Sequence, residues 1–253
     1  MTSRRMAWLA ALLAGTLLAG CVTETTGVRE PAAPDVQLRA QLDLARGYLE
    51  QREWSRAREP LARALDIDSR SAEALALMAV SYQGQQEDEL AEQYYRRALR
   101  ADPRHARTLN NYAAFLYAKG RYRDAVDPLR MLVRDPSYPD RARAYESLGL
   151  TELRIGNDDR ARDAFERALS INPQMPRSSL ELAQLGYEAG DYAAASRYYE
   201  TYRLGARQTP TSLCLGLRLA RISGNADQVA SHEIALRNLF PNSTRANNCL
   251  NER

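Results

Sequence analysis

Alanine recurs at a fixed interval along most of this chain. Five alanines are separated by 34, 34, 36 and 34 residues: Ala57, Ala91, Ala125, Ala161 and Ala195. A second column of small residues lies twelve positions earlier in each unit: Ala45, Ala79, Ala113, Gly149 and Ala183. Small side chains let two helices approach closely, so this period predicts a stack of similar helical units rather than one closed globule.

Each unit carries the signals of a helix, a turn and a second helix. A bulky residue follows the repeated alanine by four positions, one turn along the same helical face: Leu61, Tyr95, Leu129, Phe165 and Tyr199. Gly120 and Gly156 fall between the two helices, as do Gly190 and Gly224, where glycine can take the positive φ that ends a helix. The second helix is stopped by Pro103, Pro173 and Pro241.

The fourth unit resembles the tetratricopeptide repeat in its small, aromatic and proline positions, Leu148-Gly149, Ala161, Phe165, Ala168 and Pro173. The resemblance implies an all-α solenoid, with six helix-turn-helix repeats in a right-handed superhelix. We place the repeats near residues 38–71, 72–105, 106–139, 142–175, 176–209 and 210–243, followed by a short C-terminal capping helix within 244–253. The first and last repeats match least well, because Ser69 replaces the proline and Val229 replaces the alanine.

The N-terminus predicts a lipoprotein signal peptide over residues 1–20. Arg4 and Arg5 precede an apolar run that is too short to span a bilayer comfortably. The run ends in Leu18-Ala19-Gly20-Cys21, which resembles the lipobox of bacterial lipoproteins. The resemblance implies cleavage before Cys21 and covalent lipid on that residue. An ordinary leader with an accidental cysteine is the alternative.

The residue after the cysteine bears on the destination of the protein. Val22 stands where an aspartate often retains lipoproteins in the inner membrane, so the resemblance implies the periplasmic face of the outer membrane. Several acyl chains would hold the protein firmly there. Residues 21–37 contain little that is apolar and predict a flexible tether, with a root-mean-square length of roughly 20–25 Å.

The remaining candidate chemistry is sparse. Cys214 and Cys249 lie in a compartment that oxidises thiols, so we expect a disulfide that staples the last repeat to the capping helix, with two buried free thiols as the alternative. His105 and His232 are the two histidines and lack metal-ligand spacing. We therefore expect no enzyme, no metal and no cofactor apart from the lipid. The net charge is +3, and about +1 without Arg4 and Arg5, which does not predict nucleic-acid binding.

In tetratricopeptide repeats the first helices line a concave groove. The resemblance assigns these groove positions: Arg46, Arg107, Asn110, Tyr117, Arg143, Arg154, Gln184 and Tyr187. Asparagine can bond both the N–H and the C=O of an extended peptide, arginine can pair with a carboxylate, and tyrosine supplies rigid contact area. We expect this groove to bind a protein segment, with no small-molecule substrate; for the arginines, plain solvation is the alternative.

Repeats 3 and 4 carry a more particular resemblance. The segments Ala106-Arg107-x-Leu109-Asn110-Asn111-Tyr112, Tyr138-Pro139-x-Arg141 and Leu148-Gly149-Leu150, with the lengthened turn at 135–139, resemble the type IV pilus biogenesis and stability lipoproteins, the pilotins. That family implies a partner of the type IV pilus secretin, which it helps to reach the outer membrane and to form multimers. A scaffold for the barrel-insertion complex or for cell-wall hydrolases is the alternative, and a cell-wall enzyme is a third reading.

Overall fold

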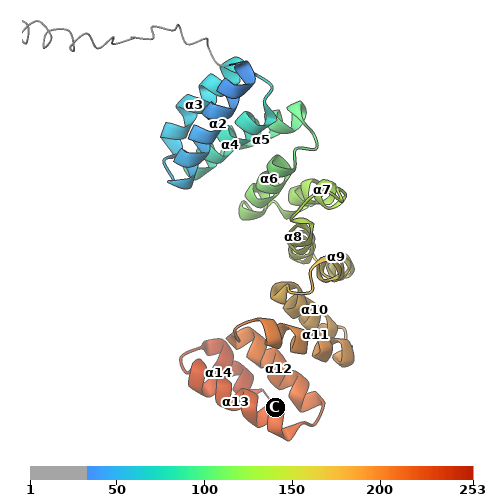
Figure 1. Cartoon of the computed structure of the whole chain (residues 1–253). Helices are drawn as coiled ribbons and strands as arrows, with labels where there is room; N and C mark the ends of the chain where they lie inside the picture. The colour runs from blue at the N-terminus through green and yellow to red at the C-terminus, as the bar shows by residue number, and fades with distance from the viewer. Residues whose placement is uncertain (1–32, 253) are drawn as a thin grey trace, which may run out of the picture. The chain divides into compact units, whose positions relative to one another are not determined.

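Helices are the regular structure of residues 33–252, the part of the chain that the computed structural model describes, and no strand occurs in that range (Figure 1). The first helices of the six repeats are α2 (Pro34–Glu50), α4 (Ala72–Gly84), α6 (Ala106–Ala118), α8 (Arg141–Arg154), α10 (Pro176–Glu188) and α12 (Pro210–Ile222). The second helices are α3 (Trp54–Ile67), α5 (Asp88–Ala101), α7 (Tyr122–Val133), α9 (Asp158–Ile171), α11 (Tyr192–Gly205) and α13 (Ala226–Leu239). The final helix is α14 (Thr244–Asn251). The predicted all-α repeat fold is confirmed.

One boundary differs from the sequence prediction. The sequence predicted a tether over residues 21–37, but its last four residues belong to α2, which begins at Pro34. Proline suits the first position of a helix because its missing N–H would have no partner there. Asp35 in the first turn adds a negative charge at the positive end of the helix dipole. The signal peptide and Cys21 lie outside the described residues.

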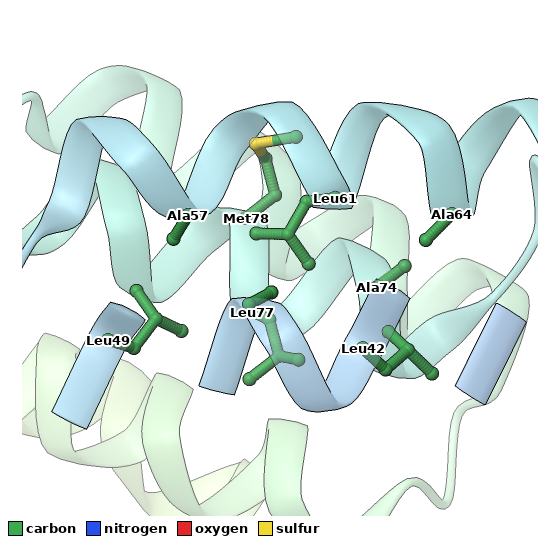
Figure 2. Packing of buried hydrophobic residues seen from close by; sticks show 9 residues of the cluster. Leu42, Leu49, Ala57, Leu61, Ala64, Ala74, Leu77 and Met78 are labelled. Carbon is green, nitrogen blue, oxygen red and sulfur yellow. The ribbon is translucent and has the colours of Figure 1, made fainter. Parts of the chain in front are cut away.

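The small-residue columns are the contact points of the helix pairs. Ala57, Ala91, Ala125, Ala161 and Ala195 are all completely buried. In the first repeat, Leu42 and Leu49 of α2 point toward α3, where Ala57 and Leu61 lie, and α4 adds Leu77 and Met78 to the same cluster (Figure 2). Each repeat thus buries its apolar face partly against its own pair and partly against the next repeat. This dependence on neighbours is what a solenoid requires.

The turns inside the repeats share one backbone conformation. Gly120, Gly156, Gly190 and Gly224 have φ between +67° and +80°, as the sequence predicted. Repeats 1 and 2 reach the same left-handed conformation without glycine, at Arg52 (φ 59°) and Gln86 (φ 63°). A side chain is strained there, so these two turns carry a cost that the later four avoid.

Three of the second helices, α3, α5 and α9, end in a common turn. Asp102 and Asn172 precede the predicted prolines and have extended backbones, because proline disfavours the helical conformation in the residue before it. Their side-chain oxygens accept the N–H of the residue two positions on, at 2.9 Å in both cases. Asp68 makes the same 2.9 Å bond although Ser69 replaces the proline. The side-chain turn therefore accounts for the helix end even where the proline is missing.

The last repeat is closed by α14. This helix contacts both α12 and α13. Ala246 and Cys249 of α14 are buried in one cluster with Leu213, Leu217 and Leu236. The predicted capping helix is confirmed, and it covers apolar surface of α12 and α13.

Candidate peptide-binding face

The first helices of neighbouring repeats lie side by side. Helix α4 contacts α6, and α10 contacts α12. Side chains bridge other neighbours: Arg46 of α2 bonds Glu73 of α4, and Ser178 of α10 donates to Glu146 of α8. We call the resulting surface the first-helix face. It carries these candidate residues: Arg46, Glu73, Arg107, Asn110, Tyr117, Arg143, Gln184 and Tyr187.

Two of the predicted peptide-binding arginines are already paired. Arg46 Nη2 and Arg107 Nη1 each lie 2.7 Å from Glu73 Oε1, so one carboxylate of repeat 2 holds guanidinium groups from repeats 1 and 3. Arg46 also pairs with Asp43. The hydrogen bond to Glu73 is the main cause that raises the pKa of Arg46. A ligand carboxylate would have to replace Glu73 at either arginine, and the role of the two residues in binding a protein segment stays a prediction.

A pocket of about 180 Å³ opens on this face between α6 and α8. Two of the candidate residues, Asn110 and Tyr117, line it together with Ala113, Ala114, Leu129, Ser147, Leu150 and Thr151. We call it the central pocket. Its lining is mostly apolar with a few hydroxyl and amide groups, which suits a short apolar side chain of a peptide whose backbone bonds the polar groups.

Tyr117 is held in place by a neighbour of α7. The rings of Tyr117 and Tyr122 meet edge to face with centroids 5.0 Å apart. The guanidinium of Arg154 lies 4.5 Å from the centroid of the Tyr122 ring, and its Nη2 donates to the Tyr122 hydroxyl at 2.5 Å. Arg154, one of the predicted groove residues, thus contacts this tyrosine, and its contact with a ligand stays a prediction. It supports the wall of the central pocket through the two rings.

Arg143 is the one predicted arginine that the described part of the chain leaves without an ion pair or hydrogen bond. It is exposed on α8, four residues before Ser147, so it lies on the side of α8 that faces the central pocket. A free guanidinium beside an apolar pocket can pair with a carboxylate of the same bound segment.

Gln184 and Tyr187 belong to a different part of the face. Gln184 lines a larger pocket of about 600 Å³, formed by α10, α12 and the C-terminal helix, and its Nε2 donates to Glu188 at 2.6 Å. Tyr187 packs on Tyr192, with ring centroids 5.7 Å apart, and on the Arg218 guanidinium, 5.9 Å from its centroid. The eight predicted residues thus fall into three separate clusters rather than one site.

Two other features bear on the chemistry of residues 33–252. No group of three or more histidine, cysteine, aspartate or glutamate side chains within that range is placed to hold a metal ion. None of the helices in the same range is both long enough and apolar enough to cross a bilayer.

Comparison with known proteins decides the family. Family descriptions of the tetratricopeptide repeat match residues 42–106, 76–139, 116–176 and 156–222. The chain is 39% identical over 228 residues to the type IV pilus assembly protein PilF of Pseudomonas aeruginosa, a match that covers 89% of this chain and 90% of that protein. The chain belongs to the PilF family of type IV pilus tetratricopeptide repeat proteins.

Solved structures of PilF and PilW agree with this assignment. The structure of P. aeruginosa PilF superposes with a TM-score of 0.74 at 39% identity, over 85% of this chain and 97% of that one. The structure of PilW, described as a widely conserved type IV pilus biogenesis factor, superposes with a TM-score of 0.65 at 27% identity, over 84% and 98%. The predicted resemblance to the pilus family is confirmed.

Sequence reasoning missed some residues of this PilF-family face. Glu73, which holds two arginines, is the second residue of repeat 2, the position that Arg107 and Arg143 occupy in repeats 3 and 4. Taking the second residue of repeat 2 as a groove position, as was done for repeats 3 and 4, would have identified Glu73. Ser147 and Thr151 of the central pocket had no such signal, because their role depends on the approach of α6 to α8.

The two cysteines lie in the apolar cluster under α14. Cys214 and Cys249 are buried, and the structure carries both as free thiols, so it differs here from the predicted disulfide. The Cys214 thiol donates to the carbonyl of Arg245, with a sulfur–oxygen distance of 3.7 Å. Burial, followed by the hydrogen bond with Cys214, raises the pKa of Cys249 to about 12. The pair is close enough to interact, and the disulfide stays a prediction.

Proposed function

We propose that this PilF-family protein is an outer-membrane lipoprotein that acts as a pilotin, a scaffold that holds a segment of the type IV pilus secretin. The observation that carries the proposal is the match to the pilus assembly protein PilF along nearly the whole chain. The lipobox resemblance at Cys21 supports the lipid anchor and the outer-membrane location. The scaffold is non-enzymatic and works by binding.

The central pocket is the proposed secretin contact. Asn110 offers an amide that can bond both backbone groups of an extended segment. Tyr117 offers a ring that Tyr122 and Arg154 hold in position, so little side-chain entropy is lost when it is covered. Arg143 adds an unpaired positive charge nearby. A segment with a small apolar residue and a neighbouring carboxylate fits these three groups.

The lipid on Cys21 would keep the protein at the membrane, in addition to any recognition of the secretin by the central pocket. A scaffold fixed to the membrane through Cys21 meets the secretin in the layer where the ring must assemble. Confinement of both partners raises their effective concentration without any new contact. The anchor and the pocket therefore contribute separately, and their loss should give different phenotypes.

The test compares four strains: a deletion, Cys21→Ala, the double variant Asn110→Ala with Arg143→Ala, and Arg123→Ala as a matched control. Arg123 is exposed on α7 and does not line the central pocket. We expect the deletion to lose secretin multimers and twitching motility. In the Cys21→Ala strain we expect secretin multimers outside the outer-membrane fraction. In the strain with both Asn110→Ala and Arg143→Ala we expect the protein to capture the secretin weakly.

The outcomes separate the readings. Normal secretin multimers and normal motility in the deletion strain would remove the pilotin role. Co-purification with the barrel-insertion complex or a cell-wall hydrolase would then favour a scaffold for that machine. A double variant that behaves like Arg123→Ala would leave the pilotin role standing and move the contact away from the central pocket.

A further inference from the structure

The larger pocket on the first-helix face has three walls from separate helices. We call it the C-terminal pocket. Glu181 and Gln184 come from α10, Thr211 and Arg218 come from α12, and Asn248 comes from α14. Its volume of about 600 Å³ is more than three times that of the central pocket. Because α14 forms one wall, the C-terminal pocket exists only where the cap is docked.

Most charge around this pocket is already compensated. Arg218 binds Glu252 with two hydrogen bonds, from Nε to Oε2 at 2.7 Å and from Nη2 to Oε1 at 2.5 Å. Arg221 Nη1 also donates to the backbone carbonyl of Glu252 at 2.7 Å. These bonds hold the end of the chain against α12, and they leave neither Arg218 nor Glu252 free for a ligand.

Glu181 lacks such a partner. The described part of the chain gives its carboxylate no hydrogen bond and no ion pair, although the side chain is half-buried in the pocket wall. Burial raises the pKa of Glu181, Arg177 opposes that shift, and the nearby carboxylates Glu146 and Glu188 add to it. An acidic group that is partly desolvated and has no ion-pair partner gains from a cation placed beside it.

The neighbouring polar groups suit a peptide backbone. Gln184 donates its amide N–H to Glu188, which leaves its side-chain carbonyl as an acceptor. Asn248 on the opposite wall is exposed and can donate and accept. Arg245 also lines the pocket, but it makes no ion pair or hydrogen bond with Glu181.

We propose that the C-terminal pocket binds an extended segment of a partner protein that places a lysine or arginine side chain against Glu181. Gln184 and Asn248 then bond the backbone of that segment from the two walls. The inference rests on the proposed role of the first-helix face in binding protein segments, but it does not require the secretin to be the partner. The protein would then have two recognition sites. Glu181 in the C-terminal pocket prefers a positively charged side chain, whereas Arg143 beside the central pocket prefers a carboxylate.

A pair of small probes tests the charge without changing the protein. N-acetyl-lysine N-methylamide carries the proposed cation, and N-acetyl-norleucine N-methylamide is its uncharged analogue. We would follow the side-chain amide NMR signals of Gln184 and Asn248 in the purified protein during titration. The lysine probe should give saturating shifts, and the norleucine probe should bind at least about tenfold more weakly, because a charged hydrogen bond is lost.

Two variants locate the cation. Glu181→Gln keeps the shape of the side chain and removes a desolvated charge, so we expect it to fold normally and to lose the preference for lysine over norleucine. Glu89→Gln removes the same charge from an exposed position on α5 that does not line the pocket and should change binding of the lysine probe by less than about twofold, because an exposed charge is screened by solvent. Equal binding of the two probes, no saturating shift at Gln184 or Asn248, or an unchanged preference in Glu181→Gln would each overturn the inference.

This experiment is independent of the pilus phenotype. If the deletion strain has normal secretin multimers while the lysine probe binds as described, the pilotin role fails and the C-terminal pocket stands. If the deletion strain loses multimers while both probes bind equally, the pilotin role stands and the pocket assignment fails.

Discussion

Arg130 of α7 and Glu152 of α8 form an ion pair that joins repeats 3 and 4, with Nη2 and Oε1 2.8 Å apart. The Glu152 side chain is 2% exposed, whereas that of Arg130 is 38% exposed. Asn157 Nδ2 donates to the second carboxylate oxygen at 2.7 Å. The carboxylate is thus buried with both oxygens bonded, and its partner reaches it from the surface.

Removing the arginine should be costly. Arg130→Ala leaves Glu152 buried with one partner, and we expect a loss of about 2–3 kcal/mol in the free energy of unfolding, below the range for pairs in which both partners are buried. Arg123→Ala, on the exposed side of the same helix, should change it by less than about 0.5 kcal/mol. Urea titrations of both variants measure the difference. Equal stabilities would show that Glu152 finds compensation elsewhere.

Gly149 and Phe165 give a second prediction. A Cβ added at Gly149 would lie 2.6 Å from Phe165 Cε1, and the Phe165 ring is completely buried. Gly149→Ala should therefore lower the free energy of unfolding by about 1–3 kcal/mol, as overpacking does. The control is Gly47→Ala in α2, where an added Cβ meets nothing within 4 Å.

The control should move in the opposite direction. Alanine is favoured over glycine inside a helix by up to about 1 kcal/mol, so Gly47→Ala should stabilise the protein. Thermal unfolding of the two variants side by side would show shifts of opposite sign. A stabilised Gly149→Ala would mean that α8 and α9 can separate at no cost.

The strained turns of repeats 1 and 2 predict a gain. Arg52 and Gln86 have positive φ where the later repeats use glycine. Arg52→Gly and Gln86→Gly should each raise the free energy of unfolding by up to about 1 kcal/mol, because relief of the left-handed strain exceeds the added chain entropy. Ala189 has φ −80°, so Ala189→Gly relieves no strain and should lower the free energy of unfolding. Calorimetric melting temperatures would rank the three variants, and a destabilised Arg52→Gly would argue against strain.

Much of the fold could be predicted from the sequence because its signals are local and repeated. The alanine at Ala57 and the glycine at Gly120 each act within one repeat, and the alanine recurs in five repeats and the glycine in four, so the copies reinforce one another. Even the replacement of proline by Ser69 was harmless, because Asp68 makes the turn by itself.

The binding face was less predictable because it depends on contacts between repeats. Arg46 and Arg107 are both neutralised by Glu73 because their side chains reach it from neighbouring helices. The position of a residue in its repeat does not reveal such a partner. The free carboxylate of Glu181 was missed for a related reason. Its surroundings include a wall from α14, more than sixty residues further along the chain.

The cysteine pair gives the last prediction. Burial raises the pKa of Cys249 to about 12, so this side chain is a neutral thiol at pH 8. Since the thiolate is the reactive form, the reduced folded protein should react with a thiol reagent at pH 8 far more slowly than the same protein in denaturant.

Oxidation should change both reactivity and stability. If the protein forms the predicted Cys214–Cys249 disulfide in an oxidising compartment, protein purified without reductant should show no reactive thiol at these positions even in denaturant. Closing that loop should raise the free energy of unfolding by about 3–4 kcal/mol on the chain-entropy account. A Cys249→Ser variant should lose this difference between oxidised and reduced samples. Two reactive thiols in denatured, unreduced protein would contradict the disulfide and leave the pair as buried packing under α14.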